Sequence, residues 1–543
     1  MLAALAALGL GGCDDVAPGR ALEGGWVGAD TAARGHRLRD RAKSGALPAA
    51  ARTRRAAVLV VGAGIAGLAA ARALDRAGID DVHLIELEDE AGGHSRGHRL
   101  AGFDCPLGAH YLPVPGDAAG EVREWLAEWG LARFAAGRWQ WDERHLCHAP
   151  QERLFIDGAW HEGLLPPAES GSATHAQYRR FAPHAAAAQR EVGFSMPALR
   201  TPWTAAHAAL EARTFAAWLD AHGLDDPKLR WYLDHCCRDD YGAGSASVSA
   251  WAGLHYFASR HGFHAPGDAD AEREPVLTWP EGNAWLARRL AAPLVDRLHV
   301  GRVALRLDAG RAAVEVLAWD VQGECIEAWR AERVVLALPV PVAARLWPEA
   351  PEALRQTAVQ ARHAPWLVAN LQVTAPLLQR VGAPPAWDSV PFGGTSLGYV
   401  DAMHQATRPH AGPTVLTAYL ALPLAERAAL LGDDWRPWAR RVLADLVPLH
   451  PDLPAKLGRV ELARHGHAMR IPLPGTRSAA AHQALARLPG RVTLAHADLA
   501  GYSVFEEAAT LGWQAGLSVA RAFGAPATAA PRPARAAAAA SRG

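Results

Sequence analysis

The sequence predicts an α/β protein, and three consecutive features predict it. Val58–Val61 is a short, continuous apolar run, which is typical of a buried parallel strand. A glycine-rich turn follows, and Ala66–Ala77 then has the alanine- and leucine-rich composition of a helix that ends at Gly78. A second apolar run, Val82–Leu87, completes a β-α-β unit. This order predicts a Rossmann-like α/β fold with parallel strands.

The turn between the first strand and the helix has the glycine spacing of a dinucleotide-binding turn. Gly62 permits the tight turn, Gly64 lets a pyrophosphate approach the backbone, and Gly67 lets helix and strand pack closely. Glu86 stands near the end of the second strand, where a carboxylate accepts hydrogen bonds from ribose hydroxyls. We therefore expect a bound dinucleotide rather than a turn without a ligand. Its expected contacts are Gly62, Gly64, Ile65, Ala66, Gly67, Glu86 and Leu87.

A second pair of glycines follows the ribose carboxylate and helps to identify the dinucleotide. Gly92-Gly93 lets the backbone approach a ligand, and the forked guanidinium of Arg96 suits a phosphate. This stretch resembles the Gly-Gly segment of the superfamily of FAD-containing amine oxidases, protoporphyrinogen oxidases and phytoene desaturases. The resemblance implies FAD as the cofactor, with Gly92, Gly93, His94 and Arg96 beside it.

Further motifs of this superfamily follow in its order between about residues 56 and 523. Residues 103–115 resemble the stretch beside the flavin, residues 301–307 the segment that contacts adenine, and residues 490–516 the last strand and helix of the FAD domain. The resemblance implies that Gly108, Ala109 and His110 lie beside the flavin and that Val303 contacts the adenine. It also implies that Asp498 lies near the ribityl chain and pyrophosphate. Glu507 and Ala508 are then expected at the N-terminus of a helix that faces the pyrimidine ring of the flavin.

The resemblance also implies two domains of the amine oxidase type. A discontinuous, Rossmann-like FAD-binding domain is expected from residues 56–140, 279–345 and 458–523. An α+β substrate domain is expected from residues 141–278 and 346–457. The chain has 20 tryptophans, and those of the substrate domain either pack its core or form aromatic walls beside the flavin.

The implied activity is that of an FAD-dependent oxidoreductase with a small-molecule substrate. The expected reaction is oxidation of an amine (CH–NH) or desaturation of a C–C bond, in either case by hydride transfer to flavin N5. Amine oxidases of this superfamily usually carry a lysine near N5, but Val368 takes that position here, in a stretch without lysine. Desaturases and isomerases lack that lysine, so both oxidations stay open. The alternatives are a flavin-dependent isomerase without net redox change and an envelope flavoprotein with a binding or structural role. The electron acceptor is not indicated.

Three side chains are candidates for catalysis: His110, Tyr241 and His467. Tyr241 ends the run Arg238–Tyr241, whose polar side chains either line a pocket or form a buried ion network. His467 lies in a stretch that resembles the segment just before the last FAD strand.

Composition excludes several kinds of partner. Lysine plus arginine equals aspartate plus glutamate, 56 of each, and without a long basic run no nucleic-acid partner is expected. No internal apolar run approaches the ~18 residues of a membrane span. His145–His148 (HLCH) offers metal ligands, but without distant partners it is more typical of polar surface, so we expect no metal site.

The N-terminus resembles a bacterial lipoprotein signal, residues 1–13, that ends in Leu10-Gly11-Gly12-Cys13. A lipid on Cys13 would anchor the protein in the cell envelope, facing the periplasm, with residues 14–55 as a tether. No membrane contact besides this lipid is expected. No basic residue precedes the apolar run, so a cytoplasmic protein with an uncleaved tail is the alternative. Residues 524–543 are rich in alanine and proline and are expected to be disordered.

Overall fold

The computed structural model describes residues 21–45, 47–260, 262–267, 275–404, 406 and 411–525. The predicted signal with Cys13 and residues 526–543 of the predicted tail lie outside these ranges, so the envelope location stays a prediction. Within the described ranges, no helix combines the length and the apolar character that crossing a membrane requires.

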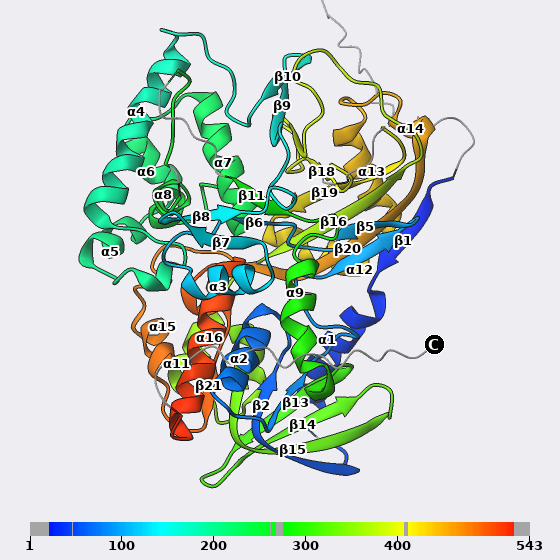
Figure 1. Cartoon of the computed structure of the whole chain (residues 1–543), viewed down its shortest axis with the longest axis vertical. Coiled ribbons are helices and arrows are strands. Elements are labelled where there is room, and N and C mark those ends of the chain that lie inside the picture. Colours follow the sequence, from blue (N-terminus) through cyan, green and yellow to red (C-terminus); the bar gives the residue numbers. More distant parts are fainter. Residues whose placement is uncertain are drawn as a thin grey trace, which may run out of the picture.

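One of two large sheets, in the lower half of Figure 1, contains the predicted β-α-β unit. Its strands lie in the order β12-β3-β2-β15-β14-β13, with β21 also paired to β15. The pairs of β2 with β3 and with β15 are parallel, as a doubly wound fold requires, which confirms the predicted α/β class. The strands are β2 (Arg52–Val61), β3 (Val82–Ile85), β12 (Leu298–His299), β13 (Arg302–Ala309), β14 (Val314–Asp320), β15 (Cys325–Leu336) and β21 (Val492–Leu494).

Helices cover both faces of this sheet. Side chains alternate along β2, so Val58 and Val60 pack into one apolar cluster and Leu59 and Val61 into the other. On the first face lie α2 (Ile65–Arg76), α3 (Gly120–Glu128), α9 (Ala284–Ala291) and α16 (Phe505–Ala522). On the second face lie α1 (Ala29–Ser44), α10 (Val340–Leu346), α11 (Glu352–Gln360) and α15 (Ala480–Ala484), next to the same cluster.

The second sheet, in the upper right of Figure 1, has the order β1-β20-β16-β19-β18-β17-β9-β10. Its strands are β1 (Glu23–Val27), β9 (Glu152–Ile156), β10 (Ala159–Glu162), β16 (His363–Val373), β17 (Asp388–Pro391), β18 (Tyr399–Asp401), β19 (Thr414–Ala421) and β20 (Leu457–Arg470). Short pairs of strands connect the layers: β4 (Gly97–Leu100) with β5 (Phe103–Pro106), β6 (Tyr111–Pro113) with β11 (Val276–Thr278), and β7 (Ala132–Ala135) with β8 (Arg138–Trp141).

Two groups of helices pack against this second sheet. Leu367 of β16 faces one group, and its neighbours Trp366 and Val368 face the other. The first group is α12 (Arg427–Gly432), α13 (Trp435–Leu446) and α14 (Leu453–Lys456). The second, at the upper left of Figure 1, is α4 (Ala173–Ala187), α5 (Ala205–Glu211), α6 (Phe215–Ala221), α7 (Pro227–Tyr241) and α8 (Ala250–Ala258).

The structure corrects two expected boundaries. The tether expected over residues 14–55 is wrong from Glu23 onward, because β1 pairs in parallel with β20 and α1 packs on the first sheet. Its composition resembles a linker, but Trp26 lies 4.7 Å from the guanidinium of Arg464 and Leu38 is buried. The FAD block expected from residue 458 also begins too early, because β20 belongs to the second sheet.

The helices α2 and α16 lie side by side, and two glycines of α16 set their distance (Figure 1). A Cβ at Gly512 would collide with the carbonyl oxygen of Ala66, and one at Gly516 with that of Ala70. The backbones therefore touch, which leaves no space for a side chain between them.

We expect Gly512→Leu to lower the free energy of unfolding by about 3 kcal/mol, because the added side chain forces the two helices apart. Denaturant unfolding followed by circular dichroism measures this change. Gly120→Ala is the control, because a Cβ at this helical glycine would meet nothing within 4 Å. Equal stability of the Leu variant and the wild type would show that the contact does not hold the helices.

Candidate active site

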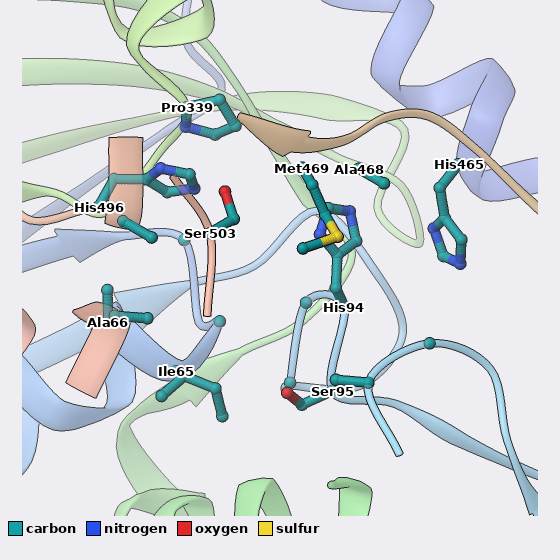
Figure 2. A pocket seen from close by; sticks show the side chains of 18 of the residues that line it. Ile65, Ala66, His94, Ser95, Pro339, His465, Ala468, Met469, His496 and Ser503 are labelled. Atoms are coloured by element: carbon teal, nitrogen blue, oxygen red, sulfur yellow. The ribbon is translucent and has the colours of Figure 1, made fainter. Parts of the chain in front are cut away.

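A single cavity of about 540 Å³ runs between the two sheets and receives most of the predicted site residues. Figure 2 shows part of it from close by, with side chains from α2, from the loop after β3 and from β20 around one space. The predicted residues that line it are Gly62, Gly64, Ile65, Ala66, Glu86, Leu87, Gly92, Gly93, His94, Arg96, Gly108, Ala109, His110, Val303 and Ala508.

The N-terminus of α2 opens into this cavity. Its first turn carries no acidic residue, and no side chain caps the helix at Gly64. Gly62 has φ +97°, a conformation that favours glycine, and a Cβ at Gly67 would collide with the Gly62 carbonyl. A Cβ at Gly93 (φ +59°) would lie 3.2 Å from the Cα of Gly64, so the two glycine turns touch. This uncapped helix end between bare backbones suits a pyrophosphate.

Glu86, just after β3, binds the backbone of the first glycine turn and of its own loop. Its Oε2 accepts a hydrogen bond from the N–H of Ala63 (2.6 Å), and its Oε1 accepts one from the N–H of Glu88 (3.0 Å). Burial raises the pKa of Glu86, and these N–H donors oppose the shift. The carboxylate lines the cavity beside Val303 of β13, where an adenosine ribose is expected.

Neutral imidazoles line the wall beside the second glycine pair. Burial holds the pKa of His94 well below its usual range and lowers that of His465 to about 4. The two rings meet edge to face with centroids 5.1 Å apart. Nearby, Arg96 donates from Nε to the Gly93 carbonyl (3.0 Å), and its guanidinium lies 3.2 Å from the carboxylate of Glu88.

The helix α16 also begins at this cavity. It starts at Phe505, without a side-chain cap at Val504, so Ala508 lies in its first turn. Glu507, expected beside the cofactor, instead points away from the cavity. Its carboxylate accepts hydrogen bonds from the hydroxyl of Tyr502 (2.6 Å) and from the N–H of Ala198.

Asp498 also lies behind the cavity wall, and His496 takes the place expected for it. Asp498 is fully buried and accepts a hydrogen bond from the N–H of Val340 (2.8 Å). Burial alone would raise the pKa of Asp498, but His496 and His363 hold it well below its usual range. Nδ1 of His496 lies 3.1 Å from the backbone nitrogen of Asp498 and 3.3 Å from its carboxylate.

Sequence reasoning missed His496, although a signal existed. The residue follows β21 closely, and ligands of doubly wound sheets bind at the carboxyl ends of parallel strands. It lines the cavity, and Figure 2 shows it on the same side as Ser503 and Pro339.

The far end of the cavity is aromatic and carries a carboxylate. The ring of His110 stacks on Tyr419 with centroids 4.2 Å apart, and burial lowers the pKa of His110 to about 3. Tyr111 donates from its hydroxyl to Asp239 (3.2 Å). Burial, and then the neighbouring carboxylate of Asp240, raise the pKa of Asp239 to about 7.

The run 238–241 was expected either to line a pocket or to form a buried ion network, and different residues of the run do each. Asp239 and Asp240 line the cavity, and Asp240 also forms a buried ion pair with Arg260 at 2.8 Å. Arg238 points elsewhere and donates to the carbonyl of Thr395 (2.6 Å). The catalytic candidate Tyr241 lies outside the cavity, fully buried, and donates to the carbonyl of Ala252 (2.9 Å).

His467 lies outside the cavity as well, and His465 lines it instead. The register between β16 and β20 shifts next to these residues, because Trp366 pairs with His465 while Ala364 pairs with Met469. The extra residues of this bulge change which side chains face the cavity.

On β16, Val368 takes the position where a lysine is usual in amine oxidases of this superfamily, and its side chain is buried and lines the cavity. The sequence has three lysines: Lys43, Lys228 and Lys456. Lys228 donates to the carbonyl of Pro167 (3.0 Å), and Lys456 pairs with Asp452 (2.6 Å). Neither lines the cavity.

The cluster 145–148 shows ordinary polar contacts. Nδ1 of His145 accepts a hydrogen bond from the indole of Trp279 (3.0 Å). Among the residues that the structure describes, no group of three histidines, cysteines or carboxylates is arranged to hold a metal ion.

Residues 65–516 match the family model described as flavin containing amine oxidoreductase. Two curated relatives are polyamine oxidase 7 of Oryza sativa subsp. japonica, 39% identical over 60 residues, and polyamine oxidase 1 of Zea mays, 42% identical over 55 residues. These matches span 11% and 10% of this chain, and only 13% and 11% of the relatives' lengths.

Solved structures resemble the chain over a much larger part of its length. Putrescine oxidase bound to putrescine covers 87% of this chain and 100% of its own at a TM-score of 0.63 and 18% identity. Cyclohexylamine oxidase from Brevibacterium oxydans covers 86% and 99% at 0.64 and 17%. A fatty acid isomerase from P. acnes covers 84% and 97% at 0.56 and 16%. At these identities the likeness establishes the fold.

The cavity fits FAD, because it offers an uncapped helix end, two glycine turns and the ribose carboxylate Glu86 in one space. We expect Glu86→Lys to leave mostly apoprotein. The lysine ammonium cannot accept the hydrogen bonds that the N–H groups of Ala63 and Glu88 and the ribose hydroxyls donate to the carboxylate. Flavin absorbance per folded chain measures the loss. Glu90→Lys, an exposed change in the same loop, should keep its flavin. Full flavin content in the Glu86 variant would contradict the ribose assignment.

Proposed function

Because the chain belongs to the flavin-containing amine oxidoreductase family and is an FAD-dependent oxidoreductase, we propose that its substrate is a cationic amine, oxidised at the CH–NH bond. The observation that carries this proposal is Asp239, a carboxylate at the aromatic end of the cofactor cavity. The names of the similar proteins, polyamine, putrescine and cyclohexylamine oxidase, agree with an amine.

The charges at this end of the cavity favour a cation. Arg260 pairs with Asp240, and both side chains are less than 10% exposed, so these two charges compensate each other. Of the three groups Asp239, Asp240 and Arg260, Asp239 is therefore the one whose negative charge no cation of this set compensates. The hydroxyl of Tyr111 satisfies part of this carboxylate, and an ammonium group of a substrate would supply the opposite charge.

The walls around Asp239 suit the rest of such a substrate. Tyr111, Trp366 and Tyr419 line the cavity with aromatic surface, which packs against alkyl chains and attracts cations to its faces. The hydroxyl of Tyr419 donates to the carbonyl of Gly108 (3.1 Å), which fixes the ring. His110 stays neutral because its pKa is about 3, so it adds no repelling charge near neutral pH.

The division of labour follows from these contacts. FAD, when bound in this cavity, would supply the acceptor for the hydride equivalent. Asp239 and the aromatic side chains hold and orient the substrate. At the other wall, the first turn of α16 has no side-chain cap but carries Glu506 and Glu507, and Glu506 lines the cavity beside Ala508.

C–C desaturation is the second candidate, and Val368 favours it. An aliphatic side chain at this position adds apolar surface to the cavity and cannot hold a water molecule by a hydrogen bond. A desaturase or isomerase substrate would not need the charge of Asp239.

The proposal is tested by anaerobic mixing of the FAD-loaded protein with pairs of substrates that share one carbon skeleton, an amine and the matching alcohol or alkane. We expect loss of the visible flavin absorbance with amines alone, and an imine product that water hydrolyses to an aldehyde or ketone and a free amine or ammonia. Bleaching by the uncharged partners, with an alkene as the product, would support desaturation and contradict the proposal.

Asp239→Asn should lower kcat/KM for an amine about tenfold to a hundredfold, the cost of losing one charge-assisted hydrogen bond. In the wild type, kcat/KM should rise with pH through about 7, because Asp239 loses its proton there while the ammonium stays charged. The Asn variant should lack this acid limb and keep its flavin. Asp220→Asn, on the surface of α6, is the control. An unchanged pH profile in the Asp239 variant would exclude this carboxylate from binding.

A further inference from the structure

The N-terminal helix α1 forms part of the cofactor cavity, although it precedes the region matched by the family. Gly35, Leu38 and Arg39 of α1 line this cavity. They follow the spacing i, i+3 and i+4, so they share one face of the helix. That face therefore looks into the site, and the helix is more than a connection between β1 and β2.

The part of the cavity under α1 is its adenosine end. The lining residues on the carboxyl side of β3 are Glu86, Leu87 and Glu88, and those on β13 are Arg302, Val303 and Ala304. Leu38 is 8% exposed and belongs to the same apolar cluster as Val303. Since Glu86 marks the ribose, Leu38 and Gly35 lie over the half of the site that receives adenosine.

Polar contacts hold α1 in this position. The guanidinium of Arg34 donates to the carboxylate of Asp89 (2.7 Å) and to the carbonyl of Leu87 (3.4 Å), both in the loop that carries the ribose carboxylate. One turn away, Arg37 lies over the ring of Trp319, 5.1 Å from its centroid. The strand β1, just before α1, pairs with β20. The N-terminal segment is thereby attached to both sheets.

Gly35 is unusual for the interior of a helix. A glycine there costs about 1 kcal/mol relative to alanine. A Cβ at Gly35 would meet nothing within 4 Å, so no protein contact requires the glycine. Gly35 is exposed and lines the rim of the cavity, where a large side chain would take room from a ligand.

We propose that α1 is the outer wall of the adenosine half of the FAD site and slows release of the cofactor. Leu38 supplies apolar contact, Gly35 leaves room for the ligand, and Arg39 offers a cation at the rim of the cavity. Arg34 acts as a positioning residue, because it fixes α1 to the loop of Glu86 without lining the cavity itself.

The test is the rate at which the full-length, FAD-loaded protein releases flavin after dilution, followed by the fluorescence of free FAD. Gly35→Phe fills the space under α1 and should speed release at least tenfold. Ala33→Phe adds the same side chain at an exposed position of the same helix and should release FAD at the wild-type rate. Release from Gly35→Phe at the rate of Ala33→Phe would overturn the proposal.

A second variant separates contact with FAD from the stability of the helix. Arg34→Ala removes the attachment to Asp89 and leaves the cavity surface unchanged, so it should also speed release, with the same melting temperature of the flavin-free protein. If Arg34→Ala speeds FAD release only as far as it lowers the melting temperature of the flavin-free protein, α1 has a purely structural role and the proposal fails. Neither measurement uses an amine, so the outcome is independent of the proposed substrate.

Discussion

The site depends on backbone contacts that leave no room for a Cβ atom. Gly67 of α2 touches the carbonyl of Gly62, and Gly512 of α16 touches the carbonyl of Ala66. These contacts place the N-terminus of α2 directly after β2 and bring the start of α16 to the same cavity. The uncapped end of α2 carries no acidic residue in its first turn, so its N–H groups and dipole favour negatively charged ligand groups. The first turn of α16 faces the same space and carries Glu506 and Glu507.

Burial gives the two ends of this cavity different charges. Near the glycine turns, burial lowers the pKa values of His94 and His465, so these imidazoles are neutral donors or acceptors. At the aromatic end, burial raises the pKa of Asp239 only to about 7, so this carboxylate can still ionise. One physical effect thus keeps the imidazoles beside the glycine turns neutral and leaves an ionisable carboxylate at the end where we propose that the substrate binds.

The sequence was informative where backbone geometry requires a residue type. The positions of Gly62, Gly64 and Glu86 at the cavity were predictable, because a tight turn and a carboxylate after a buried strand are local requirements. His465 and His467 could not be told apart, since a bulge between β16 and β20 decides which one faces the cavity. Asp498 was expected at the cofactor, but its hydrogen bond to the N–H of Val340 comes from a distant segment. The tether over α1 was a misreading for the same reason, because its partners Asp89 and Trp319 are far away in sequence.

A crystal structure of the FAD-loaded protein with a bound, non-reacting amine would show both ends of the cavity at once. We expect the pyrophosphate on the N–H groups at the start of α2, and the ammonium nitrogen about 3 Å from the carboxylate of Asp239. A pyrophosphate bound away from α2, or an amine seated without contact to Asp239, would contradict this expectation.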